Sequence, residues 1–182
     1  MPARRHSSRL ATLAVALLGA LALAPAAVAA QHPPANTPGH TFAIAGGFSQ
    51  YDIDVADSAT KAHFAVRYTR WLRSAILLEL GTGLTRFGVG TDHGYLLIPE
   101  AQIQGVGRLG RLGPYFGLGG GAVVSWLDHA DTEVWPTLSA AGGLRVGLIP
   151  ELSAAIELRV RVMGEGLSDN TAEWTLAIAW RP

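Results

Sequence analysis

The stretch Ile156-Glu-Leu-Arg-Val-Arg-Val162 (IELRVRV) alternates strictly between apolar and charged side chains. Its four apolar residues occupy the even-numbered positions, and its glutamate and two arginines occupy the odd-numbered ones. Because successive side chains of a β-strand point to opposite faces, this period of two predicts a strand with one apolar and one charged face. The stretch therefore predicts a β protein, and it leaves open which of the two faces is buried.

The same alternation recurs along most of the chain. From Thr41 onward there are eight such stretches, each about 10 to 15 residues long, the length of a transmembrane β-strand with its extensions. The predicted fold is all-β: an eight-stranded antiparallel up-and-down barrel formed by residues 41–182. The eight stretches cover roughly residues 41–51, 61–71, 74–87, 95–108, 113–127, 133–148, 152–164 and 171–181.

Residues 1–30 have the pattern of a cleaved secretory signal peptide. Arg4, Arg5 and Arg9 form a positive head before the apolar run of residues 10–24, and the small residues 27–30 offer the cleavage site. An uncleaved anchor is the alternative, but crossing a bilayer usually takes about 20 apolar residues. Residues 31–40 hold three prolines and no periodic pattern, so we expect a flexible lead-in.

Composition excludes several classes of function. The chain has no cysteine, so an exported form has no disulfide and no thiolate metal site. The 14 Lys and Arg residues balance the 14 Asp and Glu residues, whereas nucleic-acid binding requires a basic face. Lys61 is the only lysine, although soluble domains usually carry many on their surface. We therefore expect no nucleic-acid partner.

The connections between the predicted strands alternate in length and charge. Those after the second, fourth and sixth strands are tight, and arginines flank them. The other connections are longer, and they or their margins hold every aspartate of the chain. Short turns at one rim and long loops at the other are typical of outer-membrane barrels.

The alternation alone also permits a soluble, lipocalin-like periplasmic barrel with its apolar face inside. Three features argue for the opposite orientation. The first is the contrast between a uniformly apolar face and a polar face rich in glycine and alanine, as a narrow lumen requires, and the second is the near balance of arginines and glutamates on the polar face. Aromatic residues also gather near strand ends, as in interfacial girdles: Tyr68, Trp71, Phe87, Tyr95, Trp126, Trp174 and Trp180.

The polar faces together predict a network of paired charges in the lumen. Its expected role is to compensate buried charge and fix the strand register, although a gated ion or proton path is an alternative. His63 is expected to join this network. The predicted members are Arg67, Glu79, Glu100, Arg145, Glu157, Arg159, Arg161 and Glu173.

Residues 117–122 (GLGGGA) fit the spacing of a dinucleotide-binding loop. Such a loop precedes a helix and an acid about 20 residues on. Here β-branched residues follow, and the acids Asp131 and Glu133 come too early. We interpret the stretch as a strand whose lumen-facing glycines leave room for arginines from other strands.

The stretch Gly113-Pro-Tyr-Phe-Gly-Leu-Gly-Gly-Gly-Ala122 resembles a strand pattern common in the small eight-stranded outer-membrane β-barrel proteins, the group of the OmpA transmembrane domain and OmpX. The resemblance covers residues 41–182. It implies an outer-membrane location, contact with outer-membrane lipid and lipopolysaccharide, handling by the barrel-assembly machinery, a monomer, and no cofactor. The chain departs from the group in ending Trp-Arg-Pro instead of on an aromatic, and in Pro99 and Pro136, which leave the strand register there uncertain.

Few residues suggest chemistry. At the long-loop rim, aspartate and histidine could contact a divalent metal or the metal-bridged phosphates of lipopolysaccharide. Ser125 near His129 raises the alternative of a lipid A-modifying enzyme, but the serine is expected to face the lumen, away from lipid. We expect a non-enzymatic envelope protein with a structural or surface-interaction role. The candidate contact residues are Asp92, His93, Asp128, His129 and Asp131.

Overall fold

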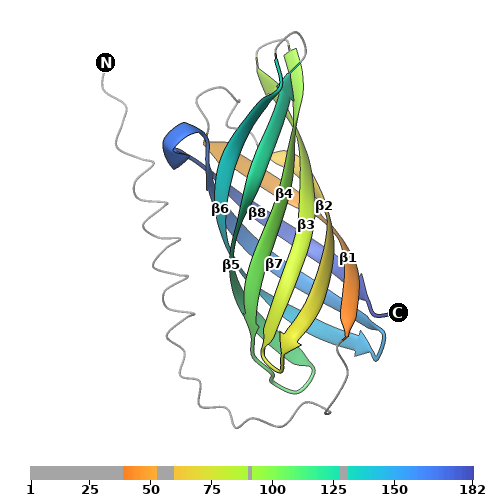
Figure 1. The fold of residues 1–182 in the computed structure, drawn as a ribbon. Coiled ribbons are helices and arrows are strands. Elements are labelled where there is room, and N and C mark those ends of the chain that lie inside the picture. Colours follow the sequence, from red (N-terminus) through yellow and green to blue (C-terminus); the bar gives the residue numbers. More distant parts are fainter. Residues whose placement is uncertain (1–38, 53–59, 90–91, 128–130) are drawn as a thin grey trace, which may run out of the picture. The chain divides into compact units, whose positions relative to one another are not determined.

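The structure is a computed structural model that describes residues 39–52, 60–89, 92–127 and 131–182. Each strand pairs antiparallel with its sequence neighbours, and β1 closes on β8, so the predicted eight-stranded barrel is confirmed (Figure 1). The predicted signal peptide and most of the lead-in lie outside the described residues. The strands are β1 His40–Asp52, β2 Lys61–Arg73, β3 Ile76–Val89, β4 Asp92–Val106, β5 Leu112–Leu127, β6 Glu133–Ile149, β7 Leu152–Met163 and β8 Asp169–Trp180.

The barrel has two distinct ends. At the turn end, β1 starts, β8 stops, and short connections join β2 to β3, β4 to β5 and β6 to β7. The opposite end, the loop end, carries the other connections, including the 3-10 helix Glu165–Leu167. One expected long loop is absent: β3 and β4 stay paired as far as Val89 and Asp92, so His93 lies inside β4. Within the described ranges, no helix is long and apolar enough to cross a membrane.

Pro99 and Pro136 are accommodated within strands because each lies where the pairing with one neighbouring strand is interrupted. The pairs between β4 and β5 skip Pro99, and the register is the same on either side of it. The pairing of β6 with β7 begins only at Thr137, so Pro136 has no partner on that side. A missing N–H is therefore tolerated at both positions.

The faces of the strands are divided as the sequence predicts, with apolar side chains outside and polar ones inside. On β8, Leu176 is 67% exposed whereas its near neighbour Glu173 is completely buried. On β7, Ile156 is 50% exposed and Glu157 only 1%. A soluble barrel requires the reverse arrangement, which argues against the lipocalin-like alternative.

Aromatic side chains cluster on the outer face near both ends. At the turn end, the ring of Phe42 lies 5.3 Å from that of Tyr68 and 5.6 Å from that of Trp180. At the loop end, the rings of Tyr95 and Trp126 are 6.1 Å apart.

Three of the expected girdle residues lie elsewhere. Phe87 points into the barrel and is 5% exposed, because it shares the inward parity of β3. Trp71 is half-buried beneath Arg108, and Trp174 lies midway along β8, opposite Phe48.

The lumen-facing glycines of β5 allow the adjoining strand β4 to approach closely. A Cβ on Gly117 would lie 2.6 Å from Oε1 of Gln102, and one on Gly121 would lie 2.8 Å from Cα of Glu100. The nearest neighbours of these glycines therefore belong to the adjoining strand β4, whereas we expected arginines from other strands.

The barrel lumen as the candidate functional site

Arg159 on β7 is the centre of a buried charge network. Its Nη2 lies 2.6 Å from Oε1 of Glu79 on β3, and its Nε lies 3.0 Å from Oε1 of Glu157. It also contacts Glu100 on β4. One guanidinium group thus links three carboxylates from three strands. These contacts join opposite walls of the barrel.

Arg67 and Arg161 extend the network to either side. Arg67 Nη2 lies 3.0 Å from Oε1 of Glu157, whose Oε2 accepts a 2.7 Å hydrogen bond from the hydroxyl of Tyr115. Arg161 donates from Nε and Nη2 to both oxygens of Glu100, at 3.1 and 3.2 Å, and it also contacts Glu173.

His63 lies at the far side of the network, where its Nε2 is 3.4 Å from Oε2 of Glu173. Its Nδ1 forms a 2.8 Å hydrogen bond with the hydroxyl of Thr85. Gly83 leaves room for the ring, since a Cβ there would lie 2.6 Å from Cε1 of His63. The histidine is fully buried and belongs to the network, as its place on the polar face suggested.

Arg145 is the one predicted network member that forms no ion pair within the described part of the chain. Its guanidinium carbon lies 5.3 Å from the centre of the Tyr115 ring. The reason is its height: Arg145 pairs in register with Gly113 and Ala155, nearer the turn end than the network residue Glu157. The other seven predicted residues lie together.

Two glutamines connect the network to the neighbouring wall. Nε2 of Gln104 donates 2.9 Å hydrogen bonds to Glu79 and to Oε1 of Gln102. Because Gln104 satisfies a lone pair of the Glu79 carboxylate, it lowers the cost of burying that charge.

Two clusters of apolar side chains adjoin the network inside the barrel. Ala45, Ala65 and Ala177 form a patch of small side chains beside the network, with Ala65 lying between His63 and Arg67 on the inner face of β2. Towards the loop end is a cluster that the sequence analysis missed, because on β4 and β5 inward and outward positions are both apolar and the alternation disappears. This apolar plug consists of Tyr51, Phe87, Leu96, Ile98, Val123 and Met163, with Trp135 packed against them.

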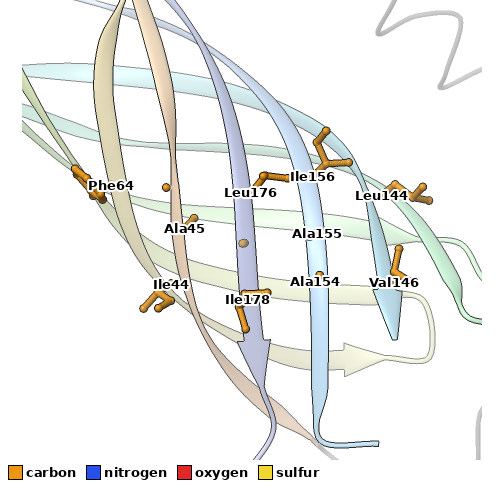
Figure 2. A pocket seen from close by; sticks show the side chains of 12 residues that line it. Ile44, Ala45, Phe64, Leu144, Val146, Ala154, Ala155, Ile156, Leu176 and Ile178 are labelled. Atoms are coloured by element: carbon orange, nitrogen blue, oxygen red, sulfur yellow. The ribbon is translucent and has the colours of Figure 1, made fainter. Parts of the chain in front are cut away.

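The outer wall carries an apolar hollow of about 600 Å³ across β6, β7, β8 and β1 (Figure 2). Small residues such as Gly46 and Ala154 form part of it, and Ile44, Leu176 and Ile178 also line it. With so few polar groups, the hollow has no means of orienting a polar substrate, although it can accept a hydrocarbon chain.

The candidate residues at the loop end are only partly described. Asp128 and His129 lie outside the described residues, as does the side chain of Asp92, whereas His93 and Asp131 are exposed. Among the described residues, no group of three His, Asp or Glu side chains could hold a metal. Ser125 faces the lumen and is 8% exposed, which separates it from lipid substrates outside the barrel.

No protein-family model and no curated protein sequence matches this chain. Among solved structures, Neisserial surface protein A superposes with a TM-score of 0.68 at 10% identity, over 79% of this chain and 97% of the other. Ail, the attachment invasion locus protein of Yersinia pestis, solved with the heparin analogue sucrose octasulfate, gives 0.59 at 15% identity, over 80% and 100%. A major outer membrane protein of Thermus thermophilus gives 0.53 at 13% identity, over 79% and 100%. The chain thus has the fold of small eight-stranded outer-membrane barrels.

Proposed function

We propose that this chain is an outer-membrane barrel with a sealed lumen and a structural or surface-interaction role in the envelope, and that it is neither an enzyme nor an open pore. The observation that carries the proposal is the inverted distribution of its side chains. Arginines and glutamates are buried in the lumen, whereas leucine, isoleucine and phenylalanine are exposed on the outer surface. Such a surface is stable only against hydrocarbon.

The outer apolar surface has the dimension that a bilayer requires. On β7 it runs from Leu152 to Val162, interrupted by no outward polar residue. A tilted transmembrane strand needs about 9 to 11 residues, so β7 matches the hydrocarbon core. The aromatic pairs at the two ends of the barrel fit the two interfaces.

The filled lumen argues against solute transport. An eight-stranded barrel is just wide enough for its own side chains to fill it. Here the charge network and the apolar plug fill the lumen one after the other, so a hydrated solute would have to break buried ion pairs to pass.

A surface-interaction role is supported by the printed names of two neighbours, a surface protein and an attachment protein. The partner class should differ from the heparin analogue bound to Ail. The connections at the loop end of this chain, and their margins, carry all of its aspartates, so polyanions would be repelled there. A cationic partner, or lipopolysaccharide phosphates bridged by divalent metal, suits this end better.

Refolding and conductance test the proposal together. The mature chain should refold into detergent micelles or lipid vesicles, migrate faster on gels before boiling than after it, and produce no steady conductance in a planar bilayer. A chain that stays monomeric and folded in detergent-free buffer would contradict the membrane location, and a stable open channel would contradict the sealed lumen. Deleting the loop-end connections one at a time, with envelope binding as the readout, tests the interaction role.

A further inference from the structure

The turn end of the barrel holds a second cluster of cationic side chains, separate from the charge network. Arg108 and Arg111 come from the connection between β4 and β5, Arg145 from β6, and Arg181 from the residues after β8. All four line one cavity of about 230 Å³, which we term the arginine mouth. Glu151 is the acidic residue that lines the same cavity.

These four guanidinium groups differ from those of the charge network in their contacts. In the described part of the chain, none of the four forms an ion pair, whereas the three arginines of the charge network contact glutamates in every case. Arg108 lies 5.6 Å from the centre of the Trp71 ring, and Arg145 lies 5.3 Å from that of Tyr115. Stacking on an aromatic face holds a guanidinium in place and leaves its N–H edges free to donate.

We propose that the arginine mouth binds a small anion that carries a phosphate group. Arginine is suited to this ligand because its planar fork donates two parallel hydrogen bonds to phosphate oxygens. The cavity is smaller than the roughly 300 Å³ at which pockets for drug-sized ligands begin, so it accommodates one phosphate with a short substituent. Apolar side chains at the rim, Trp71, Leu112 and Ile149, are compatible with a glycerol-like substituent.

Two sources could supply this chemistry. One is a free phosphate ester, and the other is the headgroup of an anionic phospholipid in the leaflet that surrounds the turn end. Only the lipid source depends on the membrane location proposed above, because a soluble ester can enter the mouth of a barrel in a micelle. The two sources therefore require separate measurements.

Calorimetric titration of the folded barrel with glycerol 3-phosphate, in an uncharged detergent, tests the soluble source. We expect saturable binding that weakens at least tenfold in Arg145→Gln and in Arg181→Gln. Arg145→Lys, which keeps the charge and loses the fork, should weaken it less. The matched control is Arg86→Gln, which removes an exposed arginine at the loop end and should bind like the parent chain. Gel mobility before and after boiling confirms that each variant is folded.

The lipid source is tested by nanodiscs that contain either phosphatidylglycerol or phosphatidylcholine, with the lipids that co-purify after detergent exchange identified by mass spectrometry. Selective retention of phosphatidylglycerol that Arg145→Gln abolishes would support a headgroup site even if glycerol 3-phosphate does not bind. The proposal is overturned if neither ligand binds, or if Arg86→Gln reduces binding as much as Arg145→Gln does.

Discussion

Arg159 and Glu79 lie 80 positions apart in the sequence, yet Nη2 of the arginine is 2.6 Å from Oε1 of the glutamate. The two residues come from β7 and β3, which are four strands apart in the ring of eight and therefore face each other across the lumen. The contact can form only in the closed barrel. It therefore links the electrostatics of the lumen to the closure of the sheet.

Replacing Arg159 by methionine should strongly destabilise the barrel. The change leaves Glu79, Glu100 and Glu157 buried without their shared cation, and removing one partner of a buried ion pair typically costs about 3 to 5 kcal/mol. Urea unfolding in lipid vesicles, followed by tryptophan fluorescence, measures the free energy of unfolding. Arg86→Met removes an exposed arginine from β3 and should change it by less than about 0.5 kcal/mol. A similar loss in both variants would contradict the structural role of the network.

Much of this fold could be predicted from the sequence because most strands have one apolar and one polar face. Alternation as regular as that of residues 156–162 predicts the strand and which residues share a face, and the balanced charges and small residues of the polar face then predict that this face is the inner one, so the network glutamates and arginines could be named without coordinates. Their pairing could not, since partners such as Arg159 and Glu79 depend on the stagger of the whole barrel. The height of Arg145, which keeps it out of the ion pairs of the network, depends on the same stagger.

The apolar plug could not be found by the same reasoning. At Leu96-Leu97-Ile98 and at Val123-Val124, apolar residues occupy both faces, and a period of two no longer distinguishes inside from outside. The predicted long connection after β3 was also wrong. We expected a longer polar connection between residues 87 and 95, whereas the pairing of β3 with β4 continues as far as Val89 and Asp92.

Truncating the plug should cost more stability than truncating the outer wall. Ile98 is fully buried among other side chains, and Ile98→Ala should leave a cavity that costs about 2 to 5 kcal/mol. Leu118→Ala removes a comparable side chain that is 59% exposed, and lipid tails can fill the space, so the loss should be smaller. Unfolding in vesicles compares the two variants directly. Equal losses would mean that the plug is not packed as a core.

Alanine at Gly119 should disturb the contact between β4 and β5. A Cβ there would lie 2.9 Å from Cα of Gln102, and backbone cannot move aside as a flexible side chain can. The matched substitution is Gly105→Ala, whose Cβ would meet its nearest neighbour at 3.9 Å. We expect Gly119→Ala to lower the free energy of unfolding and the yield of refolded barrel, with Gly105→Ala near the parent. If Gly119→Ala refolds normally, the close approach of the two strands is not required.

An arginine in the middle of the outer wall should oppose insertion. Leu176 lies among the exposed apolar residues of β8, and an arginine at the bilayer midplane costs about 2 to 4 kcal/mol. Leu72, at the turn end, should tolerate the same change at a cost of about 0 to 1 kcal/mol because the interface is polar. Unfolding in vesicles provides the free energies. A larger cost at Leu72 than at Leu176 would place the membrane differently on the barrel.

Accessible cysteines can determine which end of the barrel faces the outside of the cell. The chain has no native cysteine, so a single substitution gives an unambiguous label. Asp131→Cys lies at the loop end and Ser74→Cys lies in the connection between β2 and β3, and both positions are exposed. With the loop end outside, a maleimide too large to enter the periplasm should label Asp131→Cys on intact cells, whereas Ser74→Cys should react only after lysis. The reverse pattern would invert the topology and place the arginine mouth at the cell surface.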